Sequence, residues 1–118
     1  MTRQHLKLLR NAKDATGAKL TVTVLPGPHS VRPRYEENEE FAASYINFYV
    51  GDAVVLVPQF GDKERDLFAQ RTLSNMFPTR KVAALNIDAI AYGGGGIHCC
   101  TMQQTFLTHS THACKVAK

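Results

Sequence analysis

Two adjacent cysteines stand directly after a run of glycines, in the stretch GGGGIHCC at residues 93–100. A cysteine thiolate is a good nucleophile when nearby groups stabilise it and leave it accessible. Glycine carries no side chain, so the backbone amides of residues 94–97 can approach a ligand closely or converge on an anion. The stretch is therefore a candidate for nucleophilic catalysis on a small substrate.

Geometry limits which of these side chains can share a pocket. If residues 97–101 begin a strand-like segment, successive side chains point to opposite sides, so only one of Cys99 and Cys100 faces a given pocket. The same alternation turns His98 away from Cys99, and a catalytic base has to come from elsewhere in the fold. The residues alone leave an equal alternative, in which the glycines form a sharp bend and both thiols pack as small core residues.

A metal site is a third interpretation of the same cysteines. Its ligands would be His98, Cys99, Cys100, His109, His112 and Cys114. Adjacent cysteines do not easily share one tetrahedral ion, and the chain has no Cys-x-x-Cys pair. The glycine run also lacks the lysine and the serine or threonine that follow in a phosphate-binding loop. We therefore expect no metal and no cofactor.

Composition suits one ordinary domain that interacts with neither nucleic acid nor membrane. The chain has 118 residues, of which 44% are hydrophobic, enough for a modest core. Its 14 basic and 10 acidic residues give a net charge of +4, but these charges are spread out. Without a dense basic stripe or tryptophan, the excess predicts a solvated surface, not a nucleic-acid footprint.

The cysteine count and the first residues both favour a cytoplasmic protein. Three cysteines, two of them adjacent, make a poor disulfide framework, which fits a reducing compartment. The opening residues, MTRQHLKLLR, carry charges through what would be the apolar part of a signal peptide, and no apolar run approaches the length of a membrane span.

The first third of the chain predicts a helix and a strand. Leu6, Leu9 and Ala12 recur at three-residue steps between residues 2 and 16, until Gly17 ends the pattern, so we expect a helix that Thr2 caps, with an apolar face on a core. Apolar and polar residues then alternate over residues 20–25, which predicts a strand.

A ββαβ unit is predicted over residues 44–86. Two β-rich runs flank Gly51-Asp52, a two-residue hairpin turn with glycine at the first central position. Asp62 then caps a helix that ends before Pro78, and residues 81–86 form a further strand. The helix should bury an apolar stripe, which is Leu67, Ala69, Leu73, Met76 and Phe77. Partial units flank this complete one.

Three segments carry a family resemblance. They are ASYINFYVGDAVVLVPQFGD (43–62), MFPTRKVAALNID (76–88) and GGGGIHCCTMQQ (93–104). In this order and spacing they resemble the carboxyl-terminal region of the agmatine deiminases of the guanidino-modifying, or pentein, superfamily, which includes peptidyl-arginine deiminases. A helix, the turn Asp14–Gly17 and a Leu-Pro-x-Pro at residues 25–28 extend the resemblance more weakly.

The resemblance implies a nucleophile and a reaction. In that family the glycine-rich loop precedes Ile-His-Cys, so the nucleophile carried over by position is Cys99, with Gly94, Gly95, Gly96 and Ile97 as its substrate loop. Its thiolate would attack a small guanidino substrate, most simply agmatine, and water would release N-carbamoylputrescine for putrescine and polyamine biosynthesis. Met102 and Thr105 depart from the glutamine and proline that the family tends to carry there.

The resemblance also implies that parts of the enzyme are missing. The family's catalytic histidine sits in a Gly-His-x-Asp-type motif that this chain lacks, as it lacks the guanidinium-binding acids. The family fold is a propeller of about five ββαβ units, so we expect an α+β chain that forms a partial pentein-type propeller, the carboxyl-terminal portion of an enzyme, inactive alone, with residues 106–118 as a flexible tail. A completing chain or an oligomer would then supply the rest. The alternative is a truncated, non-catalytic pentein remnant that serves as a binding or interaction module.

Overall fold

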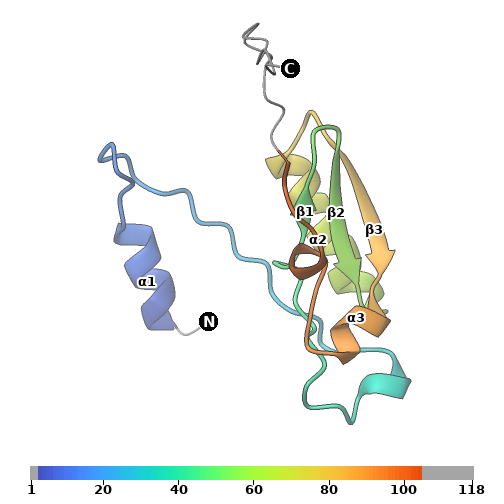
Figure 1. The fold of residues 1–118 in the computed structure, drawn as a ribbon. Helices are drawn as coiled ribbons and strands as arrows, with labels where there is room; N and C mark the ends of the chain where they lie inside the picture. Colours follow the sequence, from blue (N-terminus) through green and yellow to red (C-terminus); the bar gives the residue numbers. More distant parts are fainter. Residues whose placement is uncertain (1–2, 105–118) are drawn as a thin grey trace, which may run out of the picture.

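The computed structural model describes residues 3–104, which form a three-stranded sheet with a helix packed against it (Figure 1). In chain order the elements are α1 (Arg3–Asn11), the 3₁₀ helix η1 (Pro33–Tyr35), β1 (Tyr49–Val50), β2 (Val54–Gln59), α2 (Lys63–Met76), β3 (Lys81–Asn86), α3 (Asp88–Tyr92) and the 3₁₀ helix η2 (His98–Cys100). The expectations for Thr2 and for residues 106–118 lie outside the described residues. No helix within residues 3–104 is long and apolar enough to cross a membrane.

The predicted ββαβ unit is confirmed. Strand β1 pairs antiparallel with β2, and β3 pairs parallel with β2, so the order across the sheet is β1-β2-β3. Helix α2 makes the crossover between the parallel strands (Figure 1). Asp62 caps this helix as expected, because its side chain accepts a hydrogen bond from the backbone N–H of Arg65 at 3.1 Å.

The turn of the β1–β2 hairpin lies one residue later than predicted. Val50 pairs with Val55, and the Gly51 N–H donates to the Val54 carbonyl at 2.8 Å, so Asp52 and Ala53 occupy the centre of the turn. Gly51 does not have a positive φ. The Lys81 N–H, at the start of β3, donates to the Ala53 carbonyl at 2.9 Å, so this turn residue is also held by the parallel neighbour.

The core lies between the sheet and α2. Val55 and Val57 of β2 alternate toward it, and both are fully buried. Ala69 and Leu73 meet them from α2 and are buried to the same extent. Ile97, which follows the glycine run, belongs to the same cluster at 5% exposure.

The predicted apolar stripe of α2 is wrong at two positions. Asp66, Ala69 and Leu73 face inward, as three- and four-residue steps require. Leu67 lies about 100° further round the helix from Asp66 and is 45% exposed, and Met76, the last helical residue, is 47% exposed. A polar side chain therefore occupies the first buried position.

The N-terminal predictions are also only partly correct. Helix α1 ends at Asn11 and buries none of its described residues, and it stands apart from the sheet in Figure 1. The alternating residues 20–25 form no strand, and Leu20 and Val24 remain 42% and 44% exposed. A strand needs a hydrogen-bonded neighbour along its length; here only the Leu20 N–H donates, to the Ala12 carbonyl at 3.4 Å, and no strand of the described chain pairs with residues 21–25.

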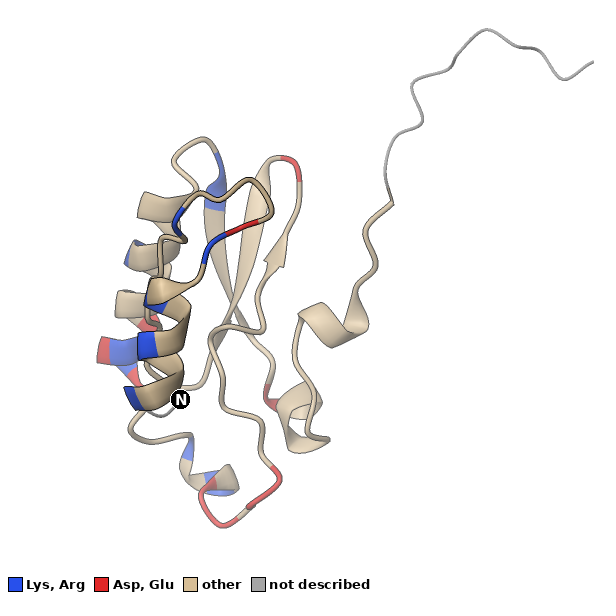
Figure 2. Cartoon of the chain, turned by 90° about the vertical axis from the view of Figure 1, so that its left-hand side faces the viewer, with Lys and Arg blue, Asp and Glu red and all other residues tan. Residues whose placement is uncertain are grey.

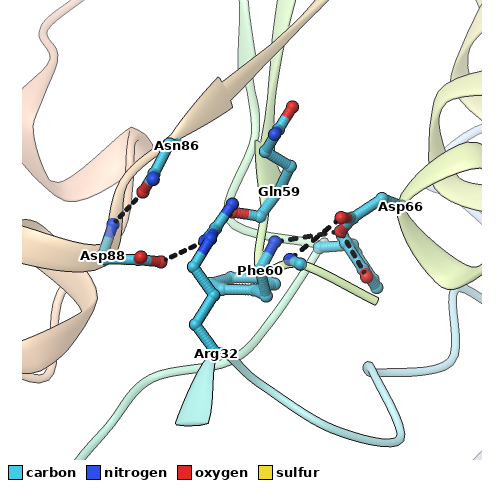
Figure 3. Close-up of polar contacts among 8 residues, drawn as sticks. Arg32, Gln59, Phe60, Asp66, Asn86 and Asp88 are labelled. Carbon is cyan, nitrogen blue, oxygen red and sulfur yellow. Dashed lines mark hydrogen bonds and ion pairs between the residues drawn. The ribbon is translucent and has the colours of Figure 1, made fainter. Parts of the chain in front are cut away.

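Asp66 is the buried polar centre of the unit. Its carboxylate, 8% exposed, accepts three hydrogen bonds: from the Tyr45 hydroxyl at 2.8 Å, and from the backbone N–H groups of Phe60 and Gly61 at 2.9 and 3.0 Å (Figure 3). The three donors lie before β1 and after β2. The carboxylate therefore holds the start of α2 against both segments.

A second polar contact, the ion pair between Arg32 and Asp88, positions the helix that precedes the glycine run. Helix α3 was not predicted from the sequence, and its first residue, Asp88, is buried and forms an ion pair with Arg32 at 2.6 Å (Figure 3). Arg32 also donates to the Gln59 carbonyl at 3.3 Å. The pair ties the end of β2 to the helix that leads into residues 93–96.

The inward face of α2 can be tested with a matched pair of leucines. We expect Leu73→Ala to lower the free energy of unfolding by about 2–5 kcal/mol, because it leaves a cavity in a fully buried site. Leu67→Ala, on the exposed side of the same helix, should change it by about 0.5 kcal/mol or less. Urea denaturation of both variants measures the difference, and equal losses would contradict the assigned face.

Tyr45 should make stability fall in alkaline solution. Burial, and then the hydrogen bond to Asp66, raise the pKa of its hydroxyl above the ordinary value. The unfolded chain therefore loses this proton first, at about pH 10, and the stabilisation present below that pH declines above it, by up to about 1.4 kcal/mol per pH unit. Denaturation at several pH values should show this decline relative to Tyr45→Phe, which has no titrating hydroxyl; parallel curves would refute it.

Candidate functional site

The two cysteines lie on a helical turn and not on a strand. Residues 98–100 form η2, in which the Cys100 N–H donates to the Ile97 carbonyl at 3.1 Å. With three residues per turn the side chains fan out around the turn and do not alternate, so the predicted strand-like alternation is wrong. Cys99 and Cys100 are both exposed free thiols, so the alternative in which the two thiols pack as core residues is wrong.

The glycine run turns the chain from α3 into η2. Gly94 has a φ of +78°, a conformation that residues with side chains rarely adopt. Gly96 and Ile97 are buried, and the Ile97 side chain anchors the end of the run in the core. The loop is therefore fixed at Ile97, with η2 directed outward.

Asn47 joins this loop to the segment before β1, and sequence reasoning missed it. Its side-chain Nδ2 donates to Cys99 Sγ at 3.2 Å, and its Oδ1 accepts from the His98 N–H at 2.8 Å. The two partners lie 51 and 52 residues further along the chain. The only signal in the sequence is an amide among apolar and aromatic neighbours in SYINFYV.

Gly96 is required by the position of Asn47. A Cβ built on Gly96 would lie 2.2 Å from Asn47 Cγ and 2.5 Å from Nδ2. No side chain can occupy that space without displacing the amide. The glycine thus allows the approach of Asn47 to the loop as well as the bend of the backbone.

Neutral hydrogen-bond donors favour the thiolate form of Cys99. The hydrogen bond from Asn47, and then one from the Gly96 backbone, lower the pKa of Cys99 below its ordinary value. Residues 41–51 and 89–104 contain no Asp, Glu, Lys or Arg, and Figure 2 shows the chain around η2 without coloured residues. The thiolate is therefore favoured without a nearby cation from these segments.

A groove lies next to η2, lined by His98 but not by Cys99 itself. It has a volume of about 570 Å³, and its other lining residues are Ile46, residues 48–50 and residues 101–103. Gln103 donates to the Val50 carbonyl at 2.8 Å and ties η2 to β1. Ile46 and Met102, which line it, are 67% and 91% exposed. The groove is large enough for a small ligand.

The other candidate ligands divide between the groove and the undescribed tail. His98 lies at the groove, while His109, His112 and Cys114 lie outside the described residues. Within residues 3–104, no group of three or more His, Cys, Asp and Glu side chains is placed to hold a metal ion.

Comparison with known sequences shows which proteins this chain resembles. Residues 1–105 match the family described as Porphyromonas-type peptidyl-arginine deiminase. Two relatives carry the name "Putative agmatine deiminase": one from Selenomonas ruminantium, 39% identical over 87% of this chain, and one from Streptococcus mutans, 48% identical over 58% of it. The matches cover 32% and 18% of those proteins, so the chain spans at most about a third of their length.

Solved structures agree with the sequence matches. The agmatine deiminase of Enterococcus faecalis superposes on 80% of this chain with a TM-score of 0.70 and 32% identity, over 29% of its own length. A substrate-bound agmatine deiminase of C. jejuni, with one cysteine changed to serine, covers 81% of this chain at a TM-score of 0.59 and 27% identity, over 25% of its own length. The α+β fold class is confirmed as part of the pentein fold.

Substitution of Gly96 tests its contact with Asn47. In a Cys100→Ser/Cys114→Ser background, where Cys99 is the only cysteine, we expect Gly96→Ala to displace the amide and slow iodoacetamide labelling at about pH 7 by about threefold or more. Gly93→Ala is the matched control, because its added Cβ would meet only the Ile90 carbonyl at 3.6 Å. Unchanged labelling of Gly96→Ala would contradict the contact.

Proposed function

Because this chain belongs to the Porphyromonas-type peptidyl-arginine deiminase family, we propose that Cys99 is the nucleophile of a site that hydrolyses a guanidino group, with agmatine as the first substrate to test. The observation that carries the proposal is the exposed thiol whose pKa is lowered by Asn47 and the Gly96 amide. An accessible thiol of lowered pKa is what covalent catalysis at neutral pH requires. The substrate is suggested by the names of the relatives.

The proposed reaction has two halves. The Cys99 thiolate attacks the guanidinium carbon, a proton reaches one amino nitrogen, and ammonia leaves from the tetrahedral adduct. Water then adds to the S-alkylthiouronium intermediate, and the carbon–sulfur bond breaks to release the ureido product and the thiolate. With agmatine the product is N-carbamoylputrescine. The loop of Gly94, Gly95, Gly96 and Ile97 would border the reacting group through its backbone, since Ile97 is itself buried.

Further groups must come from outside the segments that surround Cys99. A guanidinium is held best by carboxylates in bidentate fashion, and residues 41–51 and 89–104 supply none. We propose that the acids and the general acid–base histidine are contributed by other parts of a complete propeller, in which these 118 residues form the carboxyl-terminal portion. They would lie on a completing chain or on further residues of the same polypeptide. The exposed free thiols fit work in a reducing compartment, the cytoplasm.

A chimera tests the proposal directly. The matched region of the Enterococcus faecalis agmatine deiminase would be replaced by the corresponding residues of this chain, which supplies the missing parts from a relative of the same fold. We expect the chimera to release ammonia and N-carbamoylputrescine from agmatine, because Cys99 then meets a complete set of partners. The 118-residue chain alone should release none.

Matched cysteine variants show which thiol acts. Cys99→Ala should lower activity of the chimera to the level of a blank, whereas Cys100→Ser should retain it, because only the nucleophile forms the intermediate. Arginine and a peptidyl-arginine substrate, assayed beside agmatine, establish the preference. Full activity in Cys99→Ala would refute Cys99 as the nucleophile. Ammonia release by the isolated chain would refute the need for groups from outside it.

The second candidate is a non-catalytic pentein remnant that binds a partner. The observation in its favour is the exposed apolar surface of Ile46 and Met102 at the groove. A folded but inactive chimera, combined with Cys99 labelling no faster than that of an ordinary exposed thiol, would select this alternative.

A further inference from the structure

We propose that Asn47 is the positioning residue of the site, whose side-chain amide holds the Cys99 sulfur with one end and the loop backbone with the other. Its effect on catalysis depends on the proposed function of Cys99, but its effect on the thiol does not. The inference comes from the contacts of Asn47 with His98, Cys99 and Gly96.

Hydrogen-bond chemistry determines the orientation of the amide. The backbone N–H of His98 can only donate, so the atom 2.8 Å from it must be the carbonyl oxygen Oδ1. Nδ2 then necessarily faces Cys99 Sγ, 3.2 Å away. With the opposite orientation, a donor would face a donor at His98 and a carbonyl would face the sulfur. The backbone of the loop therefore ensures that the sulfur receives an N–H group.

Packing holds the amide in this position. Gly96 lies so close to Asn47 that even one carbon atom would overlap it. Two residues before Asn47, the buried Tyr45 is fixed by its hydrogen bond to Asp66. Gly96 thus limits the movement of the amide on one side, and Tyr45 fixes the chain that carries it on the other. A donor held in place in this way is preorganised.

The same donor serves both halves of the proposed reaction. In the free site the N–H stabilises the thiolate more than the neutral thiol, which increases the share of nucleophile near neutral pH. When the carbon–sulfur bond breaks at the end of the cycle, negative charge returns to Sγ, and the donor is already in place. In the covalent intermediate the sulfur is not an anion and needs the donor least.

Two substitutions separate this role from that of a loop support. Asn47→Ala removes both hydrogen bonds. Asn47→Asp is nearly isosteric and keeps an oxygen to accept from the His98 N–H, but it replaces the N–H donor with a second carboxylate oxygen facing the sulfur. The test follows iodoacetamide labelling and thiolate absorbance of Cys99 against pH, in the 118-residue chain with Cys100→Ser/Cys114→Ser.

The order of the labelling rates of the two variants distinguishes a donor to the sulfur from a support of the loop. We expect Asn47→Ala to label about 3- to 10-fold more slowly than the parent at about pH 7, and Asn47→Asp more slowly still, because a carboxylate disfavours the thiolate. At about pH 10, where the thiolate predominates, the rates should converge. If Asn47 only supported the loop, Asn47→Asp would keep the parental pH profile and Asn47→Ala would be the slower variant, which would overturn the proposal.

A control and a separate readout complete the design. Asn38→Ala removes another asparagine amide, one that bonds the Tyr92 carbonyl and the Glu40 N–H, and should leave the labelling profile unchanged. In the chimera, Asn47→Asp should shift the pH profile of kcat/KM upward. An inactive parental chimera with the expected labelling order would refute the proposed function alone, whereas an active chimera with an unshifted Asn47→Asp profile would refute the role of Asn47 alone.

Discussion

The buried carboxylate of Asp66 is the interaction on which the rest of the structure depends. It occupies the first inward position of α2, where an apolar residue would ordinarily pack, and accepts hydrogen bonds from the Tyr45 hydroxyl and two backbone N–H groups after β2. A buried carboxylate is tolerated only when its oxygens are satisfied in this way. Since Tyr45 stands two residues before Asn47, the same contact that completes the core also places the amide at the cysteine.

The segments around Cys99 supply neutral hydrogen-bond donors and no charged side chain. Cys99 is favoured as a thiolate by an amide N–H and a backbone N–H, without a cation from residues 41–51 or 89–104. A positive side chain beside the sulfur would repel the guanidinium of the proposed substrate, so neutral donors suit a cationic substrate better. The carboxylates that such a substrate needs are absent from these segments, which agrees with a chain about a third as long as its relative.

Sequence reasoning succeeded where local signals and the fold agree. The ββαβ unit, the cap at Asp62 and the strand at residues 81–86 followed from periodicity and end signals, and all three are present. It was wrong where the secondary structure of a segment depends on which other segments pack against it. Residues 20–25 alternate like a strand, but no strand of the described chain pairs with them. Residues 98–100 coil into η2 because Ile97, just before them, turns into the core. The buried face of α2 was misjudged because Asp66, a polar residue, belongs to it.

The sequence by itself determined the glycine run and the family resemblance, and through that resemblance the proposal of Cys99 as the nucleophile, because these depend on the types and order of residues along the chain. Only the tertiary structure decided what surrounds the thiol. Asn47 and Cys99 are 52 residues apart, and no periodicity connects them. Their contact exists because β1, β2 and α2 fold into one core that brings residue 47 beside the loop, and because a glycine at position 96 leaves room for it. A hydrogen bond of this kind depends on distance and orientation in space, which spacing along the chain does not encode.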